Sequence, residues 1–242
     1  LRRLSGGSGS RESRGSRRRA MALAVLAEQG KSEREIRSIC RTLGEAYFVR
    51  HEPEEILWHL QVLPQKGMSN AVAGIRSLDA ATLQIVVFMP NADGLFARLC
   101  RLFSCNDLDI AAARAFVTEH DFILDTFVVR LPEYLAGSDS SSFQAALQRQ
   151  LDDFLAGRFA EKKDKRQASR RARSLPIAPH IELNADPSQP DWYVLELVAV
   201  NRPYLLADIS EVFARRRISV RHAKISTLAD RAEDSFLLYS AV

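Results

Sequence analysis

The sequence predicts an α+β protein: two tandem ferredoxin-like β-α-β-β-α-β units preceded by a short helical segment. Three observations lead to this fold class. Hydrophobic residues recur at helical spacing through the first 70 residues. After residue 83, short runs rich in β-branched and aromatic residues alternate with amphipathic helical stretches. The same order of strands and helix then begins again about 110 residues further along the chain.

Composition indicates a globular protein in a reducing compartment. Of the 242 residues, 46% are hydrophobic, which is enough to form a buried core. No apolar run approaches the ~18 residues that a membrane span needs, so we expect a soluble chain without membrane contact. Three cysteines, odd in number and without metal-ligand spacing, favour the cytoplasm. The chain begins with Leu1 rather than Met, so we expect it to be a piece of a longer protein.

The net charge of +4 is unevenly distributed. Residues 1–20 contain seven Arg against one Glu, residues 162–173 contain seven basic residues against one Asp, and the remainder is net negative. Nucleic-acid-binding domains usually spread positive charge over a folded face, so we expect no nucleic-acid partner. We interpret both basic patches as solvated, mobile segments, with docking to an acidic partner surface as the alternative.

The first 70 residues are predicted to contain a basic lead and a helical segment. We interpret residues 1–16 as disordered and residues 17–70 as helices and a linker. A helix rich in Ala and Leu runs from 17 to 29, and Gly30 follows it as a C′ glycine would. Short helices bury little apolar surface on their own. We therefore expect this segment to be the end of a preceding domain or to pack against the next domain.

The sequence predicts two further helix starts in this segment. Ser32 and Glu35 have the spacing of a capping box ahead of apolar residues at helical spacing. Pro53 suits the first turn of a helix that continues over residues 54–63.

The first repeated unit is predicted over residues 80–186. Its order is β-α-β-β-α-β, the ferredoxin-like split unit. The expected elements are a strand at 83–89, a helix within 91–107, strands at 109–118 and 122–131, a helix over 139–155, and a closing strand at 180–184.

The second unit is predicted over residues 190–242 and is expected to be truncated after its third strand. Its elements are a strand at 192–200, a helix at 204–217, and strands at 218–228 and 233–242. Either the last helix and strand are missing, or something else covers an open sheet edge.

A constant offset supports the repeat. Leu95, Phe103 and Ile110 correspond to Leu205, Phe213 and Val220, each 110 positions later. The offset becomes 109 at Asp125 and Asp234, which indicates a turn one residue shorter in the second copy. Asp, a hydroxyl residue and Phe follow one another in both copies, and their default role is packing within a strand.

These residues resemble a known family. Residues 91–99 (NADGLFARL), 123–129 (ILDTFVV), 201–209 (NRPYLLADI) and 223–236 look like tandem ACT domains, small modules that often bind amino acids. They are similar to the C-terminal pair of the bifunctional uridylyltransferase/uridylyl-removing family, which modifies the nitrogen-signalling protein PII. Residues 47–59 (YFVRHEPEEILWH) are similar to the phrase that links the end of that family's hydrolase domain to its first ACT domain.

The resemblance implies a regulatory region of a multifunctional cytoplasmic enzyme. In the family, one domain transfers UMP to PII using Mg²⁺ or another divalent metal, a hydrolase domain removes it, and the ACT pair senses glutamine in the regulation of nitrogen metabolism. The expected mechanism is that glutamine shifts a domain arrangement, lowering UMP transfer and raising its removal. ACT pairing within or between chains is left open.

No catalytic motif is found in this chain, and we expect it to bind no cofactor or metal itself. No cluster of carboxylates suits a two-metal site. His120 is the one histidine followed by Asp, in a stretch that has the composition of an ordinary turn. His51, Glu55 and His59 have helical spacing, but His51 precedes Pro53 and is expected to lie outside the helix.

The loop before the first helix of each unit is the candidate effector site. A helix N-terminus offers N–H groups and partial positive charge to a ligand carboxylate, an Asp or Asn can take an ammonium group, and Gly permits close approach. In the second copy, Asn201 replaces the usual Asp and Tyr204 the usual Gly. Arg202 is a possible partner for a ligand carboxylate, and plain strand-to-helix turns are the alternative for both loops. The candidates are Asn91, Asp93, Gly94, Leu95, Phe96, Asn201, Arg202, Pro203, Tyr204 and Leu205.

Two other functions fit parts of the pattern. One is a free-standing, amino-acid-binding ACT regulator of another enzyme. The other is an RNA-binding sheet on which Phe88 and Phe127 stack bases, but the sequence lacks the basic-Gly-aromatic signature of such sheets.

Overall fold

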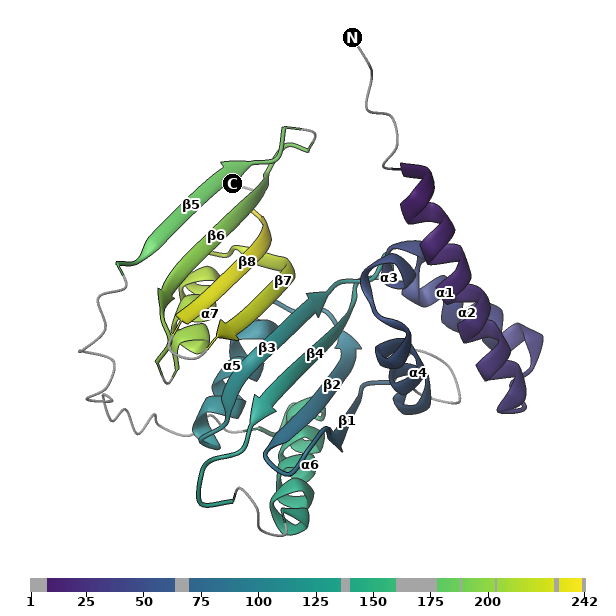
Figure 1. The fold of residues 1–242 in the computed structure, drawn as a ribbon, viewed down its shortest axis with the longest axis horizontal. Coiled ribbons are helices and arrows are strands. Elements are labelled where there is room, and N and C mark those ends of the chain that lie inside the picture. Colours follow the sequence, from purple (N-terminus) through teal and green to yellow (C-terminus); the bar gives the residue numbers. More distant parts are fainter. Residues whose placement is uncertain are drawn as a thin grey trace.

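The computed structural model describes residues 8–63, 70–135, 140–159, 178–187, 189–202, 204–228 and 231–240. Figure 1 shows a group of helices from the N-terminal part of the chain beside one half of a single sheet. Within the described ranges, no helix combines the length and apolar character that crossing a membrane requires.

The helical segment contains α1 (Ser8–Glu28), α2 (Glu33–Leu43), α3 (Glu45–Arg50) and α4 (Pro53–Val62). The predicted capping box is present: the backbone N–H of Glu35 donates to Ser32 Oγ, and the backbone N–H of Ser32 donates to Glu35 Oε2. Pro53 occupies the first turn of α4, as predicted. His51 lies outside both neighbouring helices, as the C-cap of α3.

The predicted disordered lead is wrong for residues 8–16, because α1 begins at Ser8. Arg18 donates to the carbonyl oxygens of Val49 and His51 at 3.1 and 2.7 Å and pairs with Glu52, so it is not a free solvated charge. A Cβ on Gly15 would lie 2.8 Å from a methyl of Val49, which shows how closely α1 packs. The second basic patch, residues 162–173, lies outside the described residues.

The eight strands of the described ranges join one sheet in the order β1-β2-β4-β3-β7-β8-β6-β5. The helices α5 (Leu95–Cys105), α6 (Ser141–Leu155) and α7 (Leu205–Arg215) connect them or pack on them. The strands are β1 (Val72–Ser77), β2 (Thr82–Pro90), β3 (Asp109–Phe116), β4 (Phe122–Arg130), β5 (His180–Ala185), β6 (Trp192–Val200), β7 (Ser219–Leu228) and β8 (Arg231–Tyr239).

The assignment of residues 180–184 to the first unit is wrong. These residues form β5, which pairs antiparallel with β6, from His180↔Val198 to Ala185↔Tyr193. The fourth strand of the first half is β1, which precedes β2 and was not predicted from the sequence. The second half therefore has four strands rather than three, and the boundary between the halves lies after α6. The alternating pattern at 180–184 identifies a strand but carries no information about its partner.

The two halves are related by an approximate two-fold axis. Where β3 and β7 pair, Ala113 lies opposite Ile225 and Ala115 lies opposite Ala223. At the offset of 110, Ala113 corresponds to Ala223 and Ala115 corresponds to Ile225, so exchanging the two halves turns the first pair into the second. Arg114 lies opposite Lys224, its own counterpart, so the axis passes between them. Both strands also carry a bulge at equivalent positions. The repeat predicted from the sequence is therefore a structural one.

Helices α5 and α7 pack side by side on one face of the sheet, close to the axis (Figure 1). Arg101 pairs with its counterpart Glu211 at 2.6 Å. Each half has an aromatic pair beneath its helix: Phe103 with Phe127, and Phe213 with Phe236. The opposite face of the first half is covered by the helical segment, whose Tyr47 and Phe48 belong to the same core cluster as Phe88, Phe116 and Leu124 of the sheet.

Candidate functional site

The two predicted loops have the same backbone conformation. Gly94, the N-cap of α5, has φ 70° and ψ 9°, and Tyr204, the N-cap of α7, has φ 66° and ψ 6°. Glycine adopts this left-handed conformation freely, whereas another L-residue is destabilised there by about 1–2 kcal/mol. The structure thus confirms that Tyr204 occupies the position of Gly94 and shows that the chain keeps the turn despite the side chain.

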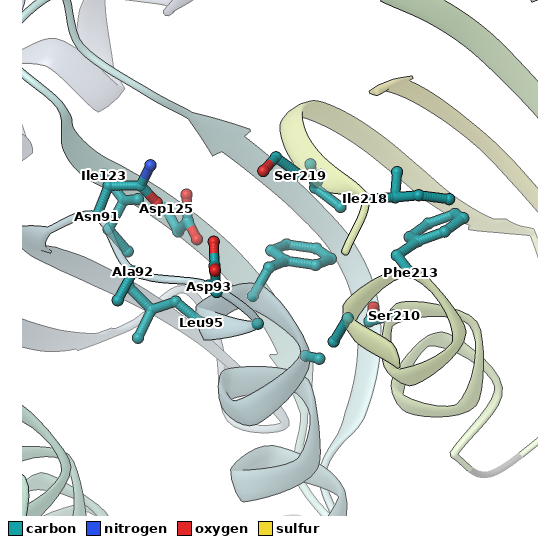
Figure 2. A pocket seen from close by; sticks show the side chains of 15 residues that line it. Asn91, Ala92, Asp93, Leu95, Ile123, Asp125, Ser210, Phe213, Ile218 and Ser219 are labelled. Carbon is teal, nitrogen blue, oxygen red and sulfur yellow. The ribbon is translucent and has the colours of Figure 1, made fainter. Parts of the chain in front are cut away.

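A pocket lies where the first loop meets the second half of the molecule (Figure 2). The first half contributes the loop, the first turn of α5 and part of β4, and the second half contributes α7 and the start of β7. Its lining residues are Asn91, Ala92, Asp93, Gly94, Leu95, Phe96, Ala97, Ile123, Asp125, Ser210, Phe213, Ala214, Ile218, Ser219 and Val220. The cavity measures about 40 Å³, which is room for a few water molecules only.

All five candidates of the first loop line this pocket: Asn91, Asp93, Gly94, Leu95 and Phe96. The Asn91 amide donates to Asp121 Oδ1 at 2.8 Å, and the Asn91 backbone N–H donates to the Asp121 carbonyl at 2.8 Å. These bonds fix the loop against the turn between β3 and β4, so Asn91 holds the loop in shape. Figure 2 shows the side chains of Asp93 and Asp125, both of which line the pocket.

Asp125 was not among the predicted site residues, yet it lines the pocket. Its side chain is almost fully buried, and burial raises the pKa of this carboxyl to about 7, although the backbone N–H of Phe116 donates to its Oδ1 at 3.2 Å. The counterpart Asp234 is also buried, with a pKa raised to about 6 by burial. A signal was present in the sequence, because Asp occurs in the same phrase in both copies, but this pattern by itself predicts only a packing role within a strand.

The candidates of the second loop do not line this pocket. Arg202 pairs with Asp208 of α7 at 2.7 Å, so its guanidinium already has a carboxylate partner within the protein. Tyr204 packs against the main hydrophobic core, and Leu205 begins α7. Asn201 directly follows β6. Pro203 lies outside the described residues.

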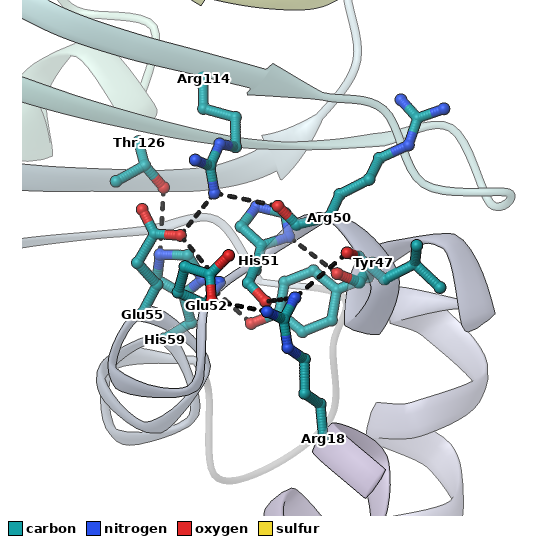
Figure 3. Close-up of polar contacts among 10 residues, drawn as sticks. Arg18, Tyr47, Arg50, His51, Glu52, Glu55, His59, Arg114 and Thr126 are labelled. Atoms are coloured by element: carbon teal, nitrogen blue, oxygen red, sulfur yellow. Dashed lines mark hydrogen bonds and ion pairs between the residues drawn. The ribbon is translucent and has the colours of Figure 1, made fainter. Parts of the chain in front are cut away.

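A buried polar network joins the helical segment to the sheet (Figure 3). His59 of α4 has one ring nitrogen 3.0 Å from the Tyr47 hydroxyl and the other 3.0 Å from the Thr126 hydroxyl of β4. Arg114 of β3 donates to Glu55 Oε2 at 2.5 Å and to the carbonyl oxygen of Arg50 at 3.0 Å. Thr126 is adjacent to Asp125 in β4, and successive strand residues face opposite sides of a sheet. The network and the pocket therefore lie on opposite faces of the same strand.

The histidines of this network are neutral. Burial lowers the pKa of His51 to about 3 and that of His59 well below its usual value. His51 donates its Nδ1–H to the Tyr47 carbonyl at 3.0 Å, and Glu55 is paired with Arg114. Across the described part of the chain, no three His, Cys, Asp or Glu side chains are grouped so as to hold a metal ion.

Comparisons with known proteins agree with this architecture. Residues 10–62 match the family model described as "Uridylyltransferase GlnD fifth domain", and residues 193–240 match the ACT domain model. The ACT match falls on the second half of the sheet, to which the first half is related by the two-fold axis.

Curated relatives match nearly the whole chain. A bifunctional uridylyltransferase/uridylyl-removing enzyme of Neisseria meningitidis is 44% identical over 239 residues, which cover 98% of this chain and 28% of the relative. Proteins of the same name from Chromobacterium violaceum and Burkholderia orbicola are 36% and 32% identical, over 82% and 93% of this chain. The chain thus spans 28% or less of the length of these relatives. Over nearly its whole length, the chain is thus similar to the C-terminal part of bifunctional uridylyltransferase/uridylyl-removing enzymes.

Proposed function

We propose that this chain is the glutamine-sensing regulatory region of a cytoplasmic enzyme that attaches UMP to the signalling protein PII and removes it. The relatives' names support the two activities, which would reside in further domains that use Mg²⁺ or another divalent metal. The observation that carries the sensing role is the pocket between the two ACT-like halves. It combines a helix N-terminus with two carboxylates, Asp93 and Asp125.

The pocket offers a partner for each charged group of an amino acid. The first turn of α5 presents N–H groups and partial positive charge, which suit the ligand's α-carboxylate. Asp93 suits the ammonium group, and Gly94 lets the ligand approach the backbone. The side-chain amide of glutamine would then point toward Asp125 and Ser210, which supply hydrogen-bond partners.

The size of the cavity gives the proposal its mechanism. At about 40 Å³ it is far smaller than the roughly 300–1,000 Å³ of typical ligand sites, so α5 and α7 must separate before an amino acid can enter. A ligand shifts a conformational equilibrium only when it binds the two states with different affinity. Glutamine would therefore favour an opened arrangement of the two halves and would bind poorly to the closed one.

Calorimetric titration of the chain with glutamine tests this function. We expect saturable heat with the unmodified chain and its loss in Asp93→Asn, because the ammonium group loses its charged partner. Asp153→Asn, which removes an exposed carboxylate of α6 that pairs with Arg158, is the matched control and should bind normally. Absence of heat from the unmodified chain at millimolar glutamine would reject the pocket as the sensor.

A further inference from the structure

The pocket between the two halves has an exposed end and a buried end. Asp93 is exposed at the loop, whereas Asp125 and Ser210, which also line the pocket, are each only 2% exposed (Figure 2). The aromatic side chains of Phe96 and Phe213 are buried in the same lining. An amino acid whose α-ammonium and α-carboxylate groups bind at the loop therefore directs its side chain toward the buried end.

The two buried polar groups of this lining are both hydrogen-bond acceptors. Oδ1 of Asp125 accepts from the Phe116 N–H at 3.2 Å, and its other oxygen, Oδ2, has no hydrogen-bond partner among the described residues. The Ser210 hydroxyl donates to the Leu206 carbonyl at 2.6 Å, so its oxygen is left to accept from a ligand. An ionised carboxylate also only accepts. The buried end therefore matches a ligand group that donates hydrogen bonds.

No cation balances a negative charge at this end, because none of the described lining residues is Lys, Arg or His. The groups that neighbouring elements present to Asp125 are Asp93 of the loop, Cys100 of α5, Val87 of β2, the Phe116 N–H of β3 and Ser210 of α7. Of these, only Asp93 and Cys100 titrate, and burial raises the pKa of the Cys100 thiol, which keeps it neutral. Two carboxylates that share such a site cannot both be ionised without a large penalty.

We propose that Asp125 selects a ligand side chain that ends in an uncharged amide over one that ends in a carboxylate. A terminal amide donates hydrogen bonds, which the Asp125 carboxylate and the Ser210 oxygen accept. The side-chain carboxylate of glutamate adds a second negative charge beside Asp125, so glutamate binds together with a proton that is taken from solvent and shared by the two carboxyl groups. This inference rests on the proposed amino-acid site and adds the residue that distinguishes glutamine from glutamate there.

Competition for this proton makes the selection depend on pH. Burial raises the pKa of Asp125 to about 7 in the empty pocket. Below this pH the carboxyl is neutral and tolerates glutamate, whereas each pH unit above it weakens glutamate binding about tenfold. Glutamine needs no added proton, because its amide offers a donor to a carboxylate and an acceptor to a carboxylic acid. The preference for glutamine over glutamate therefore increases with pH.

Calorimetric titration of the full 242-residue chain with glutamine and with glutamate, at pH 6 and pH 8, tests the inference. Glutamate should bind about tenfold more weakly at pH 8 than at pH 6, and glutamine affinity should change less than about threefold. Repeating the glutamate titration at pH 8 in buffers of different ionisation enthalpy should show uptake of about one proton. If glutamine binds but the ratio of the two affinities is the same at both pH values, this inference fails and the proposed function stands. Absence of heat with glutamine would reject the site and this inference with it.

A matched pair of variants assigns the effect to one carboxyl. Asp125→Asn removes the titrating group, so its glutamate affinity should be the same at pH 6 and pH 8. Asp234→Asn is the control, because Asp234 is also buried with a pKa raised to about 6, but it does not line the pocket and its Oδ1 is enclosed without a partner among the described residues. This variant should keep the tenfold change of the unmodified chain. Circular dichroism establishes that each variant is folded, and equal pH dependence in the two variants would overturn the role of Asp125.

Discussion

Asp125 is a buried residue whose carboxyl both lines the pocket and has a strongly raised pKa. Its carboxyl lies between the strand ladder and the pocket, with a pKa raised to about 7 by burial. A carboxyl with this pKa changes charge near neutral pH, so it can couple ligand binding to proton uptake or release. The adjacent Thr126 faces the other way, and its hydroxyl lies 3.0 Å from Nε2 of His59 in the helical segment.

Asp125→Asn should reduce the pH dependence of stability. A folded pKa above the unfolded value of about 3.9 means that the folded state binds more protons between about pH 4 and pH 7. The stabilisation is therefore complete below about pH 4 and is lost as pH rises to about 7, with an upper limit of about 4 kcal/mol. Asn keeps the acceptor for the Phe116 N–H and does not titrate. Denaturant unfolding at pH 5 and pH 8 measures the difference.

Asp79→Asn is the control for this substitution. Asp79 is an exposed carboxylate that accepts from the Ala81 N–H, so Asp79→Asn makes the same chemical change without altering a buried group. If Asp125→Asn retained the full pH dependence, the burial argument for this residue would fail.

Gly94→Ala should destabilise the fold by about 1–2 kcal/mol, because Gly94 has φ +70°. The added Cβ would also lie 3.3 Å from the Cβ of Ala214 across the pocket. Gly157 has the same φ, and a Cβ added there would have no atom within 4 Å. Gly157→Ala therefore measures the loss of stability that comes from the backbone conformation alone. Thermal unfolding of both variants measures the two losses, and a larger loss for Gly157→Ala would contradict the close approach of the halves.

At the scale of elements, the helical segment is held to the sheet by specific polar contacts as well as apolar packing. Arg114 of β3 reaches Glu55 and the Arg50 carbonyl, and Thr126 of β4 reaches His59 (Figure 3). These contacts lie near the two-fold axis, where α5 and α7 also meet on the opposite face. A movement of the two halves would therefore strain the attachment of the helical segment.

Thr126→Val should loosen this attachment. It preserves the shape of the side chain but leaves a buried nitrogen of His59 without its partner, at a cost of about 1–3 kcal/mol. Because Trp58 lies 5.7 Å from His59, its emission reports the change locally. Thr82→Val, at a half-buried position of β2, is the control. Equal stability of the two variants would show that the network adds little to the packing.

At the scale of the whole molecule, one sheet and one main core span both halves. Pairing of β3 with β7 continues the hydrogen-bond ladder across the axis, and Phe103, Phe127, Phe213 and Phe236 belong to one core cluster. The two halves are thus not independent domains. The pocket depends on this arrangement, because nine of its lining residues come from the first half and six from the second.

The described structure should therefore unfold in a single transition. Trp58 reports from the helical segment and Trp192 from the second half, so Trp192→Phe and Trp58→Phe variants allow each region to be followed alone. Coincident denaturant transitions are the expected result, since one cooperative unit gives the same midpoint for every probe. Well-separated midpoints in the two variants would mean that the helical segment and the second half unfold independently.

Periodicity and capping residues in the sequence were sufficient for most helices and strands, for the repeat at an offset of 110, and for the equivalence of the Gly94 and Tyr204 positions. These features depend on neighbours within a few positions, and the residues themselves encode them. The five residues of the first loop, predicted as a group, do lie together along one pocket. The glutamine that they are proposed to bind stays a prediction.

Tertiary structure alone decided the partner of β5, the addition of β1, the early start of α1 and the protonation of Asp125. Backbone hydrogen bonds between strands are independent of side-chain identity, so an alternating pattern cannot name the strand that it will pair with. Burial is likewise a property of the assembled fold: the same Asp in an exposed strand would keep an ordinary pKa. The sequence by itself determined two similar halves, and only their packing about a common axis created the pocket between them.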